Sequence, residues 1–322
     1  MMKKMNKKPM VALILATSIG IPCTFTPGSA LAAENIQTSV NENVKVGITD
    51  VQSELNKIGD YYYSNNLANT TIKPPHHWDY TLKKNPDKVG TNLDFSITGT
   101  ASKLNYDSVT PIYIGHNEFN NDSDQPQKFT TSKFTKAVTE GTTSTVTNGF
   151  RLGNPGLNLF TIPLILSDGM KINAEFNSST SESQQKSETK TIEASPQNIE
   201  VPAHKKYKVD VVLEQTSYWA DVTFTGEGIN LNTTINATGI HTGHMGMQES
   251  RKFSWNKNTI ELFNGLKQEQ KNNIHGIKFS NGKMNANGTG KVEGIFGSNL
   301  VVKVNDVTDP LNPILVMTKS LK

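Results

Sequence analysis

The chain has 322 residues and a formal net charge of +3, and four lysines among its first eight residues carry that excess, so the remainder is nearly neutral. Its only arginines are Arg151 and Arg251, so charge gives no reason to expect nucleic acid as a partner. Hydrophobic residues make up 35% and aromatic residues 7%, whereas Thr, Ser, Asn and Gly are abundant, which favours a mainly β protein over an ordinary α/β enzyme.

The N-terminus has the pattern of a secretory signal peptide over residues 1–32. Lysines precede an apolar run from Met10 to Ile21, and a small-residue cleavage site predicts a cut between Ala32 and Ala33. The apolar run is shorter than the roughly 20 residues of a spanning helix. Cys23, the only cysteine, lies in this segment, so we expect a secreted chain with no disulfide and no thiol chemistry.

A polar, aperiodic stretch at residues 33–46 is predicted to be a flexible leader, and residues 47–128 a receptor-binding region. Thr49 and Gln52 form a capping-box pattern, which predicts a short amphipathic helix. Its apolar positions recur at helical spacing: Val51, Leu55, Ile58 and Tyr62. Further along, alternating runs between residues 92 and 119 predict strands.

Aromatic residues are concentrated in the same region. The set comprises Tyr61, Tyr62, Tyr63, Trp78 and Tyr80. They are candidates for a receptor-binding surface, because exposed Tyr and Trp supply rigid contact area at low entropic cost. The alternative is a small core beneath a loop, because aromatic side chains also bury well.

Histidine pairs occur twice, as His76-His77 and as His241 with His244. Neither pair has a third ligand or the flanking Glu of a metalloprotease helix, so we predict no metal site. We expect no cofactor and no catalytic residues, since the sequence has no nucleophile elbow and singles out no carboxylate pair.

Residues 129–200 are predicted to be Ser/Thr-rich strands that carry an apolar hairpin at residues 150–177. The hydroxyl-rich tracts at 129–149 and 177–191 are plausible partners in a long ribbon with two polar faces, because Thr holds an extended backbone without demanding burial. A disordered linker is the alternative for these tracts.

The apolar hairpin has the period-2 pattern of a strand with one oily and one wet face. Ser167 to Gly169 is turn-forming, and Phe160 to Leu166, with Pro163 in it, is predicted to be an apolar tip loop. If the hairpin crosses a bilayer, the membrane-facing residues are Leu157, Leu159, Phe160, Ile162, Leu164, Ile165, Leu166, Met170, Ile172, Ala174 and Phe176, and the lumen-facing residues are Lys171, Asn173 and Glu175. A soluble sheet with one face on a core would show the same alternation.

Residues 201–322 are predicted to form an antiparallel β-sandwich that shares strands with the middle region. Alternation from Tyr207 to Leu213, and again at Val222 and Phe224, predicts a hairpin there. Asn258 and Glu261 predict the start of a short helix, and Asn281-Gly282 predicts a turn.

Three segments carry a resemblance to a known family: "YIGHNEFNNDSDQPQKFTTSKF", "PQNIEVPAHKKYKVDVVLEQ" and "GKVEGIFGSNLVVKVNDV". Their order around the hairpin resembles the epsilon-toxin and mosquitocidal-toxin family of aerolysin-like β-pore-forming toxins, from about residue 50 to residue 308. The N-terminal third departs most, so receptor and host do not carry over.

The resemblance implies an elongated, mainly β architecture of long antiparallel strands with a C-terminal β-sandwich and one or two short helices. It also implies secretion, trimming by a host protease, a receptor of unidentified class (protein or glycan), and a ring of subunits, commonly seven, inserted in the target-cell membrane. An animal cell, such as an insect cell, is the expected target. Whether residues beyond Asp309 form a removable tail is left open.

Two other functions are compatible with the sequence. A secreted lectin or adhesin would use the aromatic residues without inserting into a membrane. A secreted β-rich hydrolase would need a carboxylate pair, and the sequence does not single one out.

Overall fold

The computed structural model describes residues 47–75 and 78–321. The expected signal peptide with its Ala32/Ala33 cleavage site, the expected leader at 33–46 and the His76-His77 pair lie outside the described residues. Within the described ranges, no helix combines the length and the apolar character needed to span a membrane.

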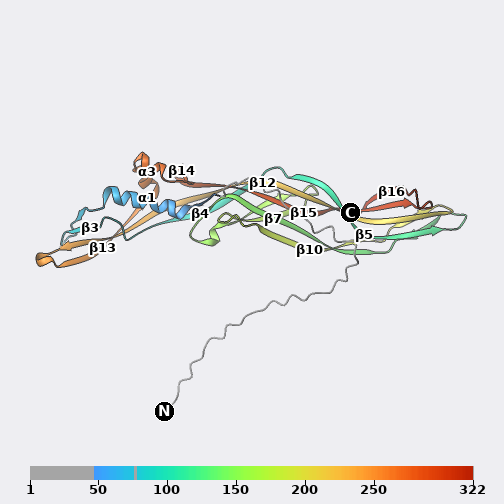
Figure 1. The fold of residues 1–322 in the computed structure, drawn as a ribbon, viewed down its shortest axis with the longest axis horizontal. Helices are drawn as coiled ribbons and strands as arrows, with labels where there is room; N and C mark the ends of the chain where they lie inside the picture. Colours follow the sequence, from blue (N-terminus) through green and yellow to red (C-terminus); the bar gives the residue numbers. More distant parts are fainter. Residues whose placement is uncertain (1–46, 76–77, 322) are drawn as a thin grey trace, which may run out of the picture. The chain divides into compact units, whose positions relative to one another are not determined.

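The central element is strand β12, which runs without a break for 38 residues, Lys205–Thr242. Strand β15 (Lys283–Asp306) pairs with it antiparallel, and so do β5 (Asn105–Asn121) and β4 (Lys88–Ala101), which follow one another along β12 (Figure 1). The far end of β12 also pairs with β13 (Gln248–Asn258). Long antiparallel strands of this kind confirm the predicted fold class.

The hairpin predicted between Tyr207 and Phe224 is wrong, because both halves belong to the single strand β12. A β-bulge at Glu214/Gln215 shifts the register there. It moves the buried positions from odd numbers, such as Leu213, to even numbers, such as Tyr218. The change of phase resembled two strands in the sequence, although nothing between them forms a turn.

The other strands of the large sheet extend this framework. β7 (Phe134–Arg151) pairs with β15, and β10 (Gln184–Ala194) pairs with β7. The shorter members are β1 (Gly47–Asp50), β2 (Thr71–Ile72), β3 (Tyr80–Leu82), β14 (Lys278–Ser280) and β16 (Ile314–Leu321). Two separate two-stranded sheets are β6 (Gln127–Thr130) with β11 (Asn198–Val201), and β8 (Leu159–Ile165) with β9 (Lys171–Asn177).

The predicted pairing of the two Ser/Thr tracts is confirmed. β7 and β10 run antiparallel from Phe134↔Ala194 to Ser144↔Gln184. Thr139 and Thr189 face each other across the ladder, with their hydroxyl oxygens 3.0 Å apart. The tracts are therefore strands, and the alternative of a disordered linker is wrong for them.

Helix α1 (Val51–Asn66) confirms the predicted amphipathic helix, although its N-cap is Asp50, which accepts from the Ser53 amide at 3.0 Å. α1 lies along β4 and β12 (Figure 1), and a Cβ at Gly59 would come within 2.5 Å of Val89. Asn258 caps α2 (Thr259–Asn264) as predicted. The remaining helical turns are α3 (Gln268–Asn272), η1 (Pro155–Asn158) and η2 (His244–Gly246).

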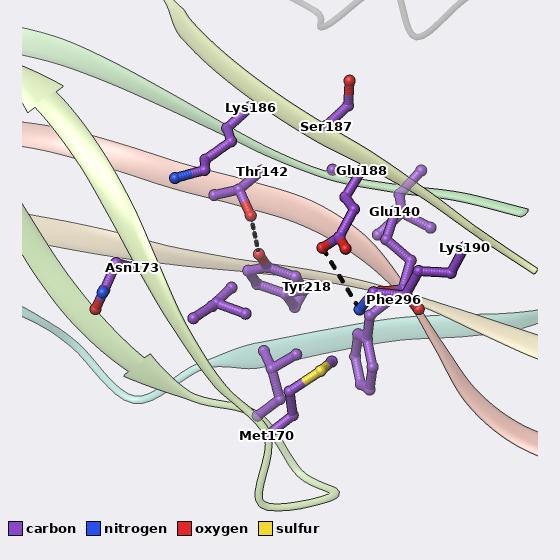
Figure 2. A pocket seen from close by; sticks show the side chains of 14 residues that line it. Glu140, Thr142, Met170, Asn173, Lys186, Ser187, Glu188, Lys190, Tyr218 and Phe296 are labelled. Carbon is purple, nitrogen blue, oxygen red and sulfur yellow. Dashed lines mark hydrogen bonds and ion pairs between the residues drawn. The ribbon is translucent and has the colours of Figure 1, made fainter.

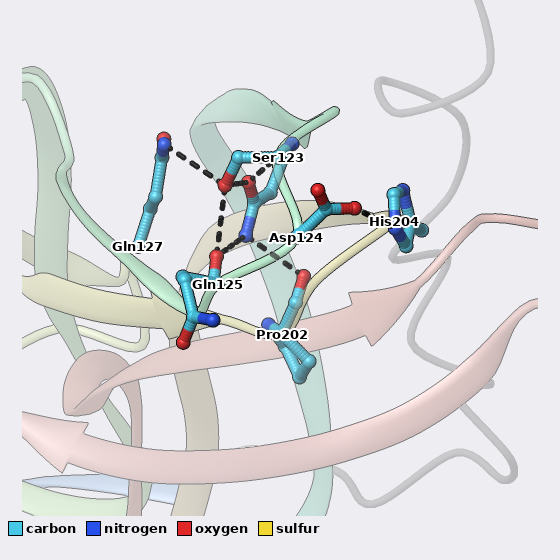
Figure 3. A network of polar contacts seen from close by, with 7 residues as sticks. Ser123, Asp124, Gln125, Gln127, Pro202 and His204 are labelled. Carbon is cyan, nitrogen blue, oxygen red and sulfur yellow. Dashed lines mark hydrogen bonds and ion pairs between the residues drawn. The ribbon is translucent and has the colours of Figure 1, made fainter.

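A network of polar contacts fixes the loop that follows β5, and Figure 3 shows Ser123 and Gln125 of this loop beside Pro202. The Asn121 amide donates to the carbonyls of Gln125, Val201 and Pro202, and its oxygen accepts from the Ser123 amide and hydroxyl. A fully buried amide is stable only with such partners. Asn121 thus ties the β5–β6 loop to the turn before β12.

The division into receptor-binding, middle and C-terminal regions stays a prediction.

Candidate functional site

The apolar hairpin forms as a regular antiparallel pair, β8 with β9, in the register Phe160↔Phe176 to Ile165↔Lys171. The turn lies at Ser167–Gly169 as predicted, where Asp168 accepts from the Met170 amide and Gly169 adopts a φ of +84°. Residues directly opposite in such a pair share a face.

The two faces of the hairpin differ sharply in burial. The inner face is apolar and consists of Phe160, Ile162, Leu164, Leu166, Met170, Ile172, Ala174 and Phe176, all of them predicted membrane-facing residues. The outer face is exposed and carries all three predicted lumen residues, Lys171, Asn173 and Glu175. One face of the hairpin is therefore hidden in the monomer, and the other is wet.

Two details of the predicted hairpin are wrong. Phe160–Leu166 is not a tip loop but strand β8 with its adjoining residue. Leu159 and Ile165 are each 62% exposed on the wet face, since they alternate with the buried residues, and Leu157 lies in η1. These three residues therefore do not share a face with the other predicted membrane-facing residues.

Aromatic rings hold the base of the hairpin against the body. Phe160 stacks on Phe176 with centroids 5.3 Å apart, and it lies 4.8 Å from Phe224 of β12. The hairpin also packs closely on β4, because a Cβ at Gly99 would fall 2.8 Å from Ile162. No feature of the sequence marked Gly99 or Phe224 as contacts of the hairpin, since they are distant along the chain.

Among the described strands, β8 and β9 pair only with each other, so no backbone ladder joins them to the large sheet. Packing of apolar side chains therefore holds the β8–β9 pair in place.

The turn end of the hairpin is packed less completely than its base. A cavity of about 420 Å³ lies beneath it, with Leu166, Met170 and Ile172 on the hairpin side and Tyr218 and Phe296 on the body side (Figure 2). A second cavity of about 530 Å³ lies between β8 and the turn that joins β4 to β5. Incomplete packing forfeits dispersion contacts, so the turn end is the more easily displaced part.

Charged groups surround the mouth of the first cavity (Figure 2). Glu140 bridges three strands: it accepts from Lys190 of β10 at 2.8 Å and from the Gly297 amide of β15 at 3.0 Å. The hydrogen bond that Lys190 donates to Glu140 raises the pKa of Lys190. Burial raises the pKa of Tyr218, whose hydroxyl lies 2.8 Å from that of Thr142. Lys186 of β10 pairs with Glu175 of the hairpin at 2.6 Å.

A second asparagine closes the loop that leads into the hairpin. The buried Asn158 side chain accepts from the Leu152 amide at 2.9 Å and donates to the Leu152 carbonyl at 3.3 Å. The Asn158 side chain therefore pairs with both backbone groups of Leu152, as a neighbouring strand would, and holds residues 152–158 as a compact loop. Sequence reasoning missed Asn158, since it looked like one polar residue between two leucines.

The five aromatic receptor candidates do not form one surface. Tyr63 and Tyr80 are fully buried, so for these two the core alternative is right and the receptor assignment is wrong in this structure. Tyr61 and Tyr62 are half-buried against the main core. Only Trp78 is widely exposed, at 63%.

Trp78 forms part of a pocket at the β12–β13 end. Its ring stacks on His241, with centroids 5.0 Å apart and planes 18° apart. The pocket of about 520 Å³ is also lined by His244, Met247 and Glu249. Because the His241 Nδ1 atom donates to the Asp79 carbonyl at 3.0 Å, its Nε2 atom is free to accept.

Among the described residues, no group of three His, Cys, Asp or Glu side chains is placed to hold a metal ion. His241 and His244, which the sequence singled out, line the Trp78 pocket instead.

The sequence pattern of the family described as Clostridium epsilon toxin ETX/Bacillus mosquitocidal toxin MTX2 matches residues 89–310, well over half of the chain. The chain belongs to this family. The predicted resemblance is confirmed, and the family is one of β-pore-forming toxins rather than enzymes. A search of curated proteins finds no match.

Solved structures share the fold at low identity. The Mpp75Aa1.1 β-pore-forming protein of Brevibacillus laterosporus is 20% identical over 85% of this chain and 95% of its own, with a TM-score of 0.57. A non-toxic crystal protein of Bacillus thuringiensis is 17% identical (86% and 99% covered, TM-score 0.51), and the Cry23Aa1–Cry37Aa1 binary complex 16% (85% and 95%, TM-score 0.52).

Proposed function

We propose that this chain is a secreted toxin that binds a target-cell surface, oligomerises and inserts the β8–β9 hairpin of each subunit into the membrane to form a pore. The observation that carries the proposal is a hairpin with an apolar inner face and, among the described residues, no strand partner outside itself. The β8–β9 pair can therefore leave the body without breaking a ladder of its own.

Energetics support a direct transfer from the protein core to lipid. Exposing one buried Leu, Ile or Phe side chain to water costs about 1.5–3 kcal/mol. Burial in hydrocarbon recovers that cost, whereas an unpaired backbone in lipid is prohibitive. One hairpin cannot close a barrel, so several subunits contribute, and a ring of seven remains an expectation from the family.

The structure refines which residues we propose for each environment. The lipid face comprises Phe160, Ile162, Leu164, Leu166, Met170, Ile172, Ala174 and Phe176. The lumen face comprises Lys171, Asn173 and Glu175, with Thr161 beside them. Leu157, Leu159 and Ile165 are removed from the lipid face.

The Trp78 pocket is our proposed contact with the target cell, and a glycan is the ligand class that it fits. One ring face of Trp78 is covered by His241 and the side chain is 63% exposed, which offers an apolar platform beside hydrogen-bonding groups. Glu249 accepts from Tyr80 at 2.7 Å, which fixes its carboxylate as a hydrogen-bond acceptor at the pocket wall. Trp78→Ala should abolish cell binding, whereas Tyr113→Ala, an exposed aromatic on β5, should not.

Proteolytic activation is proposed at the C-terminal end. Strand β16 covers the edge of β15, yet Ile314, Leu315 and Val316 are exposed, as expected for a removable cover. No Lys or Arg lies between Lys303 and Lys319, so trypsin cannot cut the connecting loop at 307–313. A chymotrypsin-like protease that cuts after the exposed Leu311 is the better activator.

Leakage of a trapped dye tests the function. Activated protein should release dye from vesicles made of target-cell lipids and glycolipids and should form oligomers that resist detergent. The rival function, a lectin or adhesin without insertion, predicts binding to the same vesicles without leakage. That result would refute the pore.

A further inference from the structure

The two ladders that meet at the hairpin base are out of register by eight residues. The upstream arm consists of β7 and β8, and the downstream arm of β9 and β10. On the upstream arm, fourteen residues (145–158) separate the end of the β7–β10 ladder from the start of the β8–β9 ladder. On the downstream arm, only six residues (178–183) separate the same two ladders. The upstream arm thus holds a surplus of eight residues.

Ser178 is the point where both registers meet. Its amide donates to the Asn158 carbonyl at 2.9 Å, which continues the β8–β9 register, and its carbonyl accepts from the Phe150 amide at 2.9 Å, which continues the β7–β10 register. Phe150 and Asn158 are eight positions apart. The eight surplus residues, 151–158, therefore form a single loop between the two residues that bond to Ser178. The Asn158 side chain closes this loop by its hydrogen bonds to Leu152.

A transmembrane hairpin needs one continuous register, because every backbone group in lipid must be paired. The seven residues of β8 are also fewer than the about 9–11 that cross a bilayer, so pairing must extend beyond the present ladder. Either the β8–β9 register extends into β7 and β10, or the β7–β10 register extends into the hairpin toward its turn.

The pattern of side chains decides between the two registers. Extending the β7–β10 register downward would place Asn154 opposite Ala174, Asn158 opposite Met170 and Asp168 opposite Phe160. Polar groups without partners in hydrocarbon cost several kcal/mol each. The β8–β9 register instead keeps the face of Phe160, Ile162 and Leu164 wholly apolar.

We propose, on the basis of the pore function above, that β7 slips eight residues past β10 on insertion, that the 151–158 loop is drawn into the strand, and that Asn158 is the positioning residue that stores the loop in the monomer. Eight is an even number, so each side chain keeps its face during the slip. The bonds lost include the ladder of β7 with β15 over residues 141–148, the pairing of β7 with β1, the Lys190–Glu140 ion pair and the Thr139–Thr189 contact.

The slip explains the composition of the two arms. A strand with one apolar face has a strongly fixed register, whereas a ribbon that is polar on both faces has a weakly fixed one. After the slip, Thr147 faces Thr189, so one hydroxyl pair replaces another. Ser and Thr thus permit movement over residues 139–145, whereas the buried Val138, Val146 and Phe150 of β7 must leave their packing contacts during the slip.

Cysteine pairs test the slip in a background without Cys23. Thr139→Cys/Thr189→Cys matches the monomer, where the hydroxyl oxygens are 3.0 Å apart. Thr147→Cys/Thr189→Cys is the matched pair for the slipped state, since in the monomer its sites are offset by about 26 Å along the ribbon. Cross-linking within one subunit is scored by gel mobility under non-reducing conditions, before and after leakage of glycolipid vesicles.

We expect the 139/189 pair to cross-link in solution and to block leakage until a reductant is added, and the 147/189 pair to cross-link only in membrane oligomers. Leakage by the oxidised 139/189 protein, or cross-linking of 139/189 but not 147/189 in the pore, would overturn the slip and leave the pore function standing. If the cysteine-free parent never releases dye, the pore function itself fails.

Discussion

Arg151 lies against Asp50, with its Nη2 atom 2.8 Å and its Nε atom 3.1 Å from the same carboxylate oxygen. Arg151 is the last residue of β7 and the first of the 151–158 loop, and Asp50 caps helix α1. The ion pair therefore holds the end of β7 against helix α1, and it must break when the 151–158 loop joins the strand.

Acid should weaken this fastening. Burial opposes the charge on Asp50, but the Ser53 amide and Arg151 outweigh burial and lower the pKa of Asp50. Stability from a lowered carboxyl pKa is present above the unfolded value, about 3.9, and is lost as pH falls through the folded value.

Asp50→Asn should therefore lower the free energy of unfolding by up to about 1 kcal/mol at pH 7, as expected for an exposed pair. It should make no difference at a pH below the folded pKa of Asp50. Urea unfolding of both proteins across that range checks this, and an equal gap at every pH would contradict it.

Removal of the Asn158 side chain, which closes the 151–158 loop, should speed insertion. Asn158→Ala leaves the Leu152 amide and carbonyl without their partner, a loss of about 1–3 kcal/mol, so the monomer should melt lower and vesicle leakage should start sooner. Leu157→Ala, from the same loop but exposed and without a side-chain hydrogen bond to lose, is the control and should behave nearly as wild type. Slower leakage by the Asn158 variant would show that the hydrogen bonds of Asn158 do not restrain the loop.

The lipid face is tested by neighbouring lysine substitutions. Ile172→Lys should fold, because Ile172 is only half-buried beside a cavity, but should not permeabilise vesicles, since lysine at mid-bilayer costs about 2–4 kcal/mol in each subunit. Asn173→Lys, one residue away on the wet face, should remain active. Equal activity of the two variants would sink the assignment of faces.

The lumen face is tested by ion selectivity. Lys171→Glu changes the lumen charge by two units in every subunit and should shift the reversal potential of single channels in a salt gradient toward cation selectivity, with pores still formed. Lys278→Glu, an exposed lysine on β14, should leave selectivity unchanged. An unchanged potential for both variants would place Lys171 outside the lumen.

Local patterns predicted much of the hairpin. The alternation around Met170 to Phe176 and the turn at Ser167–Gly169 depend on neighbours in the chain, so the sequence contains them. The contact of Phe160 with Phe224 and the close approach at Gly99 depend on tertiary packing, which no local pattern records. The error at Phe160–Leu166 arose because Pro163 disfavours a ladder, yet an isolated pair has free edges on which proline is tolerated.

Burial separated the aromatic candidates where composition could not. Tyr63 and Trp78 are equally plausible surface residues by type, but the Tyr63 hydroxyl donates to the Lys83 carbonyl at 2.6 Å inside a small core. Likewise, the bulge at Glu214/Gln215 gave one long strand the appearance of two. In both cases long-range pairing overrode the local signal.

Insertion of the β8–β9 hairpin is the central claim, and site-specific quenching measures it most directly. Single cysteines at each position from 171 to 176 in a Cys23-free protein carry an environment-sensitive dye, and active oligomers on glycolipid vesicles are probed with iodide in water and with nitroxide lipids. We predict alternation, with 172, 174 and 176 quenched from lipid and 171, 173 and 175 from water. Quenching by iodide at all six positions, with none from lipid, would contradict insertion.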